Sequence, residues 1–245
     1  MSADGFDQAL TVFSPEGRLY QVEYAFRAVR TSGLSHLAIR CADGVVLVSQ
    51  LPSTDRLVDV TNSTFIHPIS GSTVCMVCGR IADGRRVVDR VRSEAIDFFR
   101  KWDYHPTADI ICERLADINQ VYTQEAWQRP FGNVAIFAGW DEERESPLLF
   151  RTDPAGTCVG YFSTAAGAKE TELVDALAAL QRTWKGPCPS VQDGIRIALR
   201  QVQRTLHTGI TADDVEVAVV ERTGFRRLVA TEIDQLLADL AVGPE

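Results

Sequence analysis

Hydrophobic positions near the N-terminus recur with the period of a helix. Over residues 18–31 the apolar side chains fall at three- and four-residue spacing, which predicts a short amphipathic helix. Its stripe consists of Leu19, Val22, Ala25, Phe26 and Val29. Glu23 and Arg27 stand four apart, in the order that favours an ion pair along a helix. The preceding Ser14-Pro15-Glu16-Gly17 fits a type I turn, so the chain is predicted to turn sharply into a helix that must bury one side.

Beyond residue 33 the chain shows short apolar runs followed by apolar residues at helical spacing. This succession of runs and helical spacing occurs twice. Strands are predicted at about 34–41, 45–50, 64–69, 73–79, 133–140, 147–151, 157–165, 215–221 and 226–230. Helices are predicted at about 82–102, from 107 to the stretch Arg129-Pro130-Phe131-Gly132, and at about 168–183, 190–206 and 231–241. Ala42-Asp43-Gly44 separates the first two runs, and Asp-Gly in so short a loop predicts a hairpin.

The order of these blocks predicts the fold class. Strands, two helices, strands, two helices and strands follow one another, which matches neither the strand–helix alternation of a doubly wound sheet nor an all-β chain. Two antiparallel sheets can bury every apolar stripe if each packs one face on the other sheet and one face on a helix pair. The prediction is an α+β protein with a four-layer α/β/β/α sandwich. No linker or repeat interrupts the pattern, so we expect a single domain over 1–245.

Composition and charge exclude several classes of function. With 45% hydrophobic residues and a net charge of −8, the chain is typical of a soluble globular protein and unsuited to nucleic acid or anionic membranes. No run approaches the ~20 apolar residues that cross a bilayer. Residues 1–12 show no signal-peptide pattern.

Metal and cofactor chemistry has little support in the sequence. Cys75 and Cys78 have the spacing of a zinc or redox pair, but no second pair accompanies them, so we interpret the cysteines as reduced and mostly buried. His36, His67, His105 and His207 form no metal spacing, and we expect each at the surface or at a cap. The acidic residues of the first long helix are expected on its solvated face; they are Asp89, Glu94, Asp97 and Asp103. We predict no metal and no cofactor.

Several motifs, in order along the chain, resemble one known family. The block from Phe13 to Ala25 resembles the N-terminal signature of proteasome alpha subunits, and its continuation to Arg30 resembles the alpha type-6 group in particular. Further matching motifs are Tyr122-Thr123-Gln124, Arg129-Pro130-x-Gly132, Gly139-x-Asp141, Asp153-Pro154-Ala155-Gly156, Thr164-Ala165-Ala166-Gly167 and Glu232-Ile233-Asp234. Together they span about residues 6–241.

The resemblance implies the fold of N-terminal nucleophile hydrolases, with a gate segment and turn over 1–17, an extra N-terminal helix over 18–31 and a sandwich over 34–241. In catalytic relatives a processed threonine supplies both the nucleophile and the free amine that takes its proton. The matching position here is Leu34-Ser35, inside the chain. The aspartate position is Gln50, and the lysine position is Phe65 or Ile66. The resemblance therefore implies a non-catalytic subunit of a threonine-type endopeptidase complex.

The family also implies a role and partners. A ring of seven alpha subunits lies on a ring of beta subunits, and the alpha N-terminal segments restrict the entry of unfolded polypeptide. The expected partners are neighbouring alpha subunits, beta-ring subunits, regulatory particles or activators, and polypeptide in transit, during ubiquitin-dependent degradation in cytoplasm and nucleus. The 82–102 helix is expected to pack on the beta ring. The turn and the ring-contact helix are assigned Ser14, Pro15, Gly17, Leu19, Tyr20, Val22, Glu23, Tyr24 and Phe26.

Two departures from the family pattern bear on function. Phe6-Asp7-Gln8 stands where alpha subunits usually carry Tyr-Asp-Arg, which predicts a weaker contribution to the open gate. In the activator pocket, assigned Phe65 and Gly79, phenylalanine replaces the lysine that would hold a carboxylate, so docking there is expected to be weak or absent.

Three alternatives stay open at this point. The chain could be an active threonine hydrolase, or an alpha ring that assembles with itself and acts as a binding module. The N-terminal helix could also pack only on its own domain.

Overall fold

The computed structural model describes residues 8–52, 63–184, 186–206 and 209–242. The elements run in the order α1 (Tyr20–Arg30), β1 (Ser35–Arg40), β2 (Gly44–Gln50), β3 (Ile66–Ser70), β4 (Thr73–Gly79), α2 (Ile81–Trp102), α3 (Ala108–Gln124), β5 (Asn133–Asp141), β6 (Ser146–Thr152), β7 (Cys158–Gly160), β8 (Ser163–Gly167), α4 (Glu170–Trp184), α5 (Val191–Leu206), β9 (Val215–Glu221), β10 (Gly224–Arg227) and α6 (Ala230–Val242). A short 3₁₀ turn, Ala212–Asp214, precedes β9.

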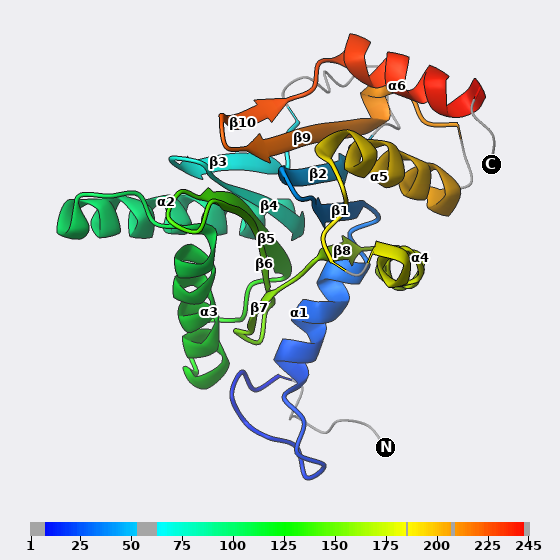
Figure 1. The fold of residues 1–245 in the computed structure, drawn as a ribbon. Helices are drawn as coiled ribbons and strands as arrows, with labels where there is room; N and C mark the ends of the chain where they lie inside the picture. The colour runs from blue at the N-terminus through cyan, green and yellow to red at the C-terminus, as the bar shows by residue number, and fades with distance from the viewer. Residues whose placement is uncertain (1–7, 53–62, 185, 207–208, 243–245) are drawn as a thin grey trace.

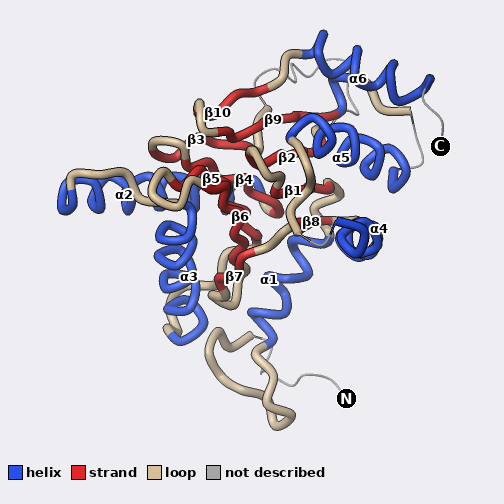
Figure 2. Tube along the Cα trace, in the orientation of Figure 1, coloured by secondary structure: helices blue, strands red, loops and turns tan. Residues whose placement is uncertain are grey.

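Two five-stranded sheets form the middle of the molecule. Their strand orders are β10-β9-β2-β1-β8 and β3-β4-β5-β6-β7, and neighbouring strands are antiparallel throughout. Helices α2 and α3 cover the second sheet, whereas α4 and α5 cover the first (Figure 1). Figure 2 shows the strands between these two groups of helices. The predicted α+β sandwich of four layers is confirmed, including the hairpin between β1 and β2.

Each contact between layers has its own apolar core. One cluster lies between the first sheet and α4, α5 and α6, a second lies between the two sheets, and a third lies between the second sheet and α2 and α3. Alternate residues of a strand point to opposite faces, so Leu37 and Ile39 enter the first cluster while Ala38 enters the second. Burial on both faces explains why the central strands are continuously apolar in sequence.

The strand predicted at 157–165 is wrong, because two short strands of different sheets occupy this stretch. β7 pairs with β6 in the second sheet, and β8 pairs with β1 in the first. Between them the Tyr161 amide donates to the Leu149 carbonyl at 2.9 Å, and the Phe162 carbonyl accepts from the Arg40 amide at 2.7 Å. The chain therefore crosses from one sheet to the other over two residues, which the apolar pattern does not reveal.

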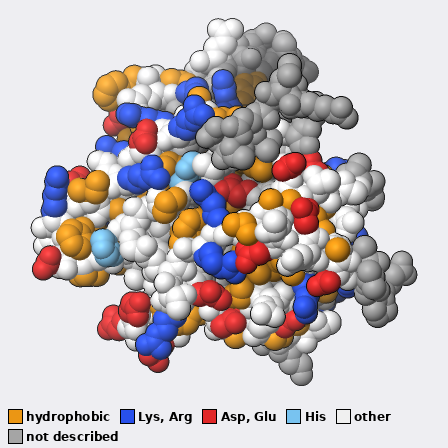
Figure 3. All heavy atoms as spheres, turned by 90° about the horizontal axis from the view of Figure 1, so that it is seen from above, with side chains coloured by type: hydrophobic (Ala, Val, Ile, Leu, Met, Phe, Trp, Pro, Cys, Tyr) orange, Lys and Arg blue, Asp and Glu red, His pale blue; other side chains and the backbone are white. Residues whose placement is uncertain are grey.

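The face of the molecule seen in Figure 3 is chemically mixed. Basic, acidic and hydrophobic side chains are interspersed over the face in Figure 3, despite the net charge of −8. Asp89, Asp97 and Asp103 are exposed as predicted, and Glu94 is half-buried. Within the described part of the chain, no helix is both long and apolar enough to span a bilayer.

Candidate functional site

The turn at Ser14-Pro15-Glu16-Gly17 is closed at both ends by backbone hydrogen bonds. The Gly17 amide donates to the Ser14 carbonyl at 2.8 Å, and the Ser14 amide donates to the Arg18 carbonyl at 3.0 Å. Gly17 has φ +76°, a left-handed conformation that glycine adopts without strain. The Ser14 hydroxyl accepts from the Arg18 amide at 3.2 Å, and Ser14 is buried. The predicted turn is confirmed, and Ser14 and Gly17 each have a local reason.

An ion pair joins this turn to α1. Arg18 Nε donates to Glu23 Oε1 at 2.7 Å, and a second guanidinium nitrogen contacts the other carboxylate oxygen. The hydrogen bond from Arg18 holds the pKa of Glu23 below its ordinary value. The predicted pair between Glu23 and Arg27 is present only as a weaker electrostatic attraction, since Arg18 takes the carboxylate and Arg27 lies over the Tyr24 ring, 5.8 Å from its centroid. The helix starts at Tyr20 rather than residue 18, because Arg18 still belongs to the turn.

Helix α1 buries one narrow face and leaves several apolar side chains of its stripe only partly covered. Ala25 and Val29 are buried, and Val29 belongs to the core between the two sheets. The predicted contact residues Leu19, Tyr20, Val22 and Phe26 are only half-buried. Tyr24 is 38% exposed, and Phe13 before the turn is 62% exposed. Figure 1 shows the turn projecting beyond the end of the sandwich, so these side chains are available to another surface.

Ser35, at the predicted nucleophile position, is held inside the chain by its own peptide group. The Ser35 amide donates to the side-chain carbonyl of Gln50 at 3.1 Å. The carbonyl of Leu34, one residue earlier, accepts from the Ala168 amide at 2.9 Å. Gly167 lies so close that a Cβ there would stand 2.0 Å from that carbonyl. The nitrogen of Ser35 is therefore an amide already engaged as a donor, and it cannot act as a base.

His36 is completely buried, so its expected place at the surface is wrong. Its ring meets the Phe65 ring edge-on at 5.2 Å between centroids, and neither nitrogen has a partner among the described atoms. Burial lowers the pKa of His36 to about 3, which keeps the imidazole neutral. The strand period could have revealed this, because His36 shares a face of β1 with Ala38 in the core between the sheets.

Phe65 lies on a small pocket of about 140 Å³. Phe65 is buried, and its amide donates to Glu216 at 3.0 Å. The pocket is also lined by Arg85, an exposed cation that sequence reasoning missed, and by His67. Burial and nearby arginines lower the pKa of His67 to about 4. Gly79 stands at the end of β4 with φ +127°, next to Gly132, and is not part of the pocket wall.

The motif around Arg129 and Gly132 is explained by Asp83, a residue the sequence did not single out. Arg129 donates to both carboxylate oxygens of Asp83, at 2.7 and 2.8 Å, and the Gly132 amide donates to the same carboxylate at 2.8 Å. Burial acts to raise the pKa of Asp83, but these hydrogen bonds outweigh it and hold the pKa below its ordinary value. The contacts fasten the segment before β5 to the first turn of α2.

The cysteines and histidines considered for metal or redox chemistry do not come together in one site. Cys75 belongs to the core under α2 and α3, whereas Cys78 belongs to the core between the sheets, so the pair points to opposite faces of β4. Among the described residues, no group of three or more His, Cys, Asp or Glu could hold a metal ion. His207, Phe6 and Asp7 lie outside the described residues, and Gln8 is exposed.

Comparison with known proteins gives consistent similarities along almost the whole chain. A proteasome subunit family model matches residues 30–220, and a model of the N-terminal signature of A-type proteasome subunits matches residues 6–28. A probable proteasome subunit alpha type-1 of Schizosaccharomyces pombe is 38% identical over 98% of each chain. A proteasome subunit alpha type-6 of Caenorhabditis elegans is 32% identical over 98% of this chain and 97% of its own. A proteasome subunit alpha of Methanopyrus kandleri is 34% identical over 98% and 94%.

Proposed function

The chain belongs to the proteasome alpha-subunit family, whose members are non-catalytic, and from that premise we propose that it is a structural and gating subunit of the outer alpha ring of the 20S core particle. The observation that carries the proposal is the contact between the Ser35 amide and Gln50. In this contact the Ser35 nitrogen is a peptide amide that donates a hydrogen bond, whereas a catalytic relative needs a free terminal amine at the same position. The preceding turn and α1 then serve contact and gating rather than processing.

The active-hydrolase alternative requires removal of residues 1–34. That cleavage would take away the turn and the whole of α1, and with them Val29 from the core between the sheets. N-terminal sequencing of the chain from its assembled particle tests this. We expect an intact segment before Ser35, and a chain that starts at residue 35 would contradict the proposal.

We propose that the partly covered apolar side chains of α1 contact neighbouring subunits. Val22 and Phe26 are half-buried apolar residues on its predicted stripe. Changing both to aspartate would place charges in that contact and reduce incorporation of the chain into the ring. Arg30→Gln is the matched control, because Arg30 is exposed on the same helix. Equal incorporation of the double variant and the control would contradict this contact.

For the gate, we propose a weak contribution from this subunit. Gln8 carries no charge, and Phe6, outside the described residues, has no hydroxyl to donate. The double change Phe6→Tyr with Gln8→Arg supplies both groups. We expect it to change peptide hydrolysis by the assembled particle, with and without an activator, more than Gln8→Arg alone does. Unchanged hydrolysis in both conditions would contradict the proposal.

Activator docking beside Phe65 is proposed to be weak or absent. A buried phenylalanine offers no cation to a C-terminal carboxylate, whereas Arg85 on the pocket wall does. Binding of an activator-tail peptide is measured for the assembled particle and for the Arg85→Gln variant. The comparison shows whether the carboxylate of the tail binds beside Phe65 or at Arg85. A tail fully ordered against Phe65 would contradict the proposal, whereas binding lost in Arg85→Gln would assign the carboxylate to Arg85.

We also propose that the chain occupies the ring position of the alpha type-6 group and forms a single domain over 1–245. The resemblance of its closing motif Glu232-Ile233-Asp234 to that group is what supports the ring position; within the chain, Glu232 accepts from Arg226 at 3.0 Å, and Ile233 is buried. Cross-linking within the particle identifies the ring neighbours, and one cooperative unfolding transition is the expected sign of a single domain. The proposed setting is ubiquitin-dependent degradation in cytoplasm and nucleus, with beta-ring subunits and regulatory particles as partners.

A further inference from the structure

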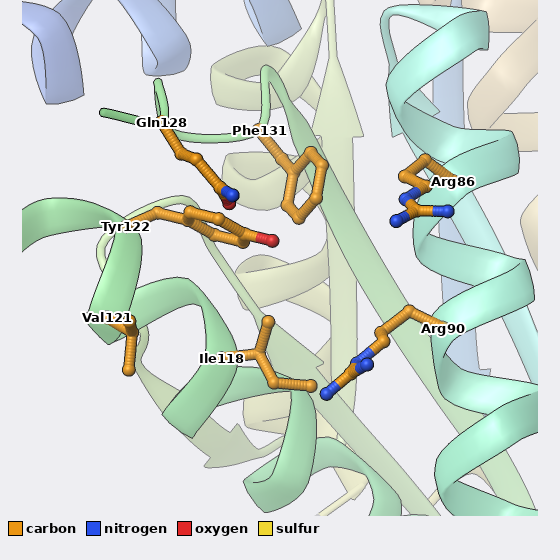
Figure 4. A pocket seen from close by; sticks show the side chains of 7 residues that line it. All are labelled: Arg86, Arg90, Ile118, Val121, Tyr122, Gln128 and Phe131. Carbon is orange, nitrogen blue, oxygen red and sulfur yellow. The ribbon is translucent and has the colours of Figure 1, made fainter. Parts of the chain in front are cut away.

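A pocket of about 250 Å³ lies between α2 and α3. Figure 4 shows Arg86 and Arg90 reaching into it from α2, opposite Ile118 and Tyr122 of α3 and Phe131 of the following segment. Its complete lining, which we call the Arg86–Arg90 pocket, is Arg86, Arg90, Ile118, Val121, Tyr122, Gln128 and Phe131. One wall is thus cationic, and the other is aromatic and aliphatic.

The polar groups of this pocket are incompletely used within the chain. Arg90 pairs with Glu94 at 3.0 Å, but Arg86 is exposed and has no hydrogen bond or ion pair within the described part of the chain. The Tyr122 ring packs edge-on against Phe131 at 4.9 Å. Its hydroxyl points into the pocket in Figure 4 and likewise lacks a partner among the described residues. The pocket therefore presents an available guanidinium, a phenol donor and an apolar wall.

These groups define the chemistry of an occupant. A guanidinium binds a carboxylate through two parallel hydrogen bonds, and an occupant that displaces water from the pocket strengthens that contact relative to open water. The apolar wall favours a neighbouring aliphatic or aromatic group over a free, fully hydrated anion. On a chain of net charge −8, two adjacent arginines with one carboxylate partner complement an acidic group rather than a basic one.

Resting on the proposed function, with beta-ring subunits as partners, and on the expectation that α2 faces that ring, we propose that the Arg86–Arg90 pocket binds an aspartate or glutamate side chain of a facing beta-type subunit, flanked in that subunit by an apolar residue. Val121 in this lining is itself exposed, an apolar side chain that such a partner would cover. The acidic side chain fixes the position of one ring on the other, and the apolar neighbour fills the wall beside Tyr122.

Zero-length cross-linking in the assembled particle tests this contact directly. Arg86→Lys keeps the charge and introduces an amine, which a carbodiimide joins to a carboxylate in contact by forming an amide with loss of one water. The background is low, because the natural lysines are only Lys101, Lys169 and Lys185. Arg182→Lys is the matched control, since Arg182 is exposed on α4, on the opposite outer layer.

We expect mass spectrometry to find a link from position 86 to an Asp or Glu of a beta-type chain with an apolar neighbour, and no such link from the control. Links from position 86 only to its own chain or to alpha-type chains, or no link at all in an intact particle, would overturn the inference. Failure of the proposed function looks different, because then no particle with other subunits is recovered.

Charge reversal gives a second readout. Arg86→Glu should lower the yield of alpha rings joined to beta rings roughly tenfold or more, and the reverse change at the cross-linked carboxylate should restore it. Arg182→Glu should leave the yield unchanged. An equal loss in both variants would indicate a general folding effect and would contradict a specific contact at the Arg86–Arg90 pocket.

Discussion

His36 gives the fold a pH dependence that a single substitution should remove. The imidazole is fully buried beside Phe65, and both of its nitrogens lack partners among the described atoms. Folding therefore favours the neutral ring and lowers its pKa from the ordinary 6.5 to about 3. His36→Leu removes the titrating group and the two unsatisfied nitrogens while keeping an apolar side chain on β1.

The magnitude follows from linkage between protonation and folding. Because the pKa is lower in the folded state, the unfolded chain binds more protons below pH 6.5. Stability is thus fully present above pH 6.5 and declines as the pH falls toward the folded value. Between pH 7.5 and 5.5 the loss attributable to His36 is about 1.4 kcal/mol. This figure depends on the ordinary pKa and changes little if the folded pKa is anywhere below 4.5.

Urea unfolding of the purified chain measures the free energy of unfolding at pH 7.5 and pH 5.5. The transition is monitored by the fluorescence of the four tryptophans. The stability of His36→Leu relative to the natural chain should rise by about 1.4 kcal/mol at pH 5.5 compared with pH 7.5. Ser35→Ala is the matched control, because its buried hydroxyl also lacks a described partner but does not titrate in this range. A stability difference for His36→Leu that is the same at both pH values would refute the reasoning.

Three further predictions concern the support of α2, the end of β4 and the thiols. Asp83→Ala should lower the free energy of unfolding by about 2–3 kcal/mol, measured by urea unfolding, because it leaves the buried Gly132 amide and Arg129 without their acceptor; a loss below about 0.5 kcal/mol would contradict this role. Gly79→Ala should cost ~3 kcal/mol or more in a thermal or urea melt, since φ is +127° and a Cβ would stand 2.3 Å from the Gly132 carbonyl; a variant as stable as the parent would show that this close approach is not required. A maleimide should label only Cys158 in the native chain and all six cysteines in urea, because Cys158 alone is half-buried; rapid native labelling elsewhere would contradict the burial.

The fold class was predictable because periodicity and turn chemistry agree along the chain. Both helix pairs, the β1–β2 hairpin and the turn at Ser14–Gly17 follow from apolar spacing and from the residues that turns require. The two-residue crossing between β7 and β8 was not predictable, since β-strands on either side of it have the same composition whichever sheet they join. Strand pairing over long sequence distances determines the sheet, and a local pattern does not contain that information.

The candidate site was only partly accessible from the sequence for the same reason. The residues of the turn and of α1 are local, so their spacing revealed them. Asp83 and Arg85 act through residues that are distant in the chain, at Arg129 and in the Phe65 pocket respectively, and nothing near them in sequence marks this role. The ion pair from Arg18 to Glu23 was missed because the turn, and not the helix period, sets its geometry.

Native purification of the chain with identification of its partners tests the central claim most directly. We predict that mass spectrometry will find a full set of other alpha-type and beta-type chains in one particle, with this chain's N-terminal segment intact before Ser35. A particle made of this chain alone, or a chain cleaved at Ser35, would contradict the account of a non-catalytic alpha-ring subunit.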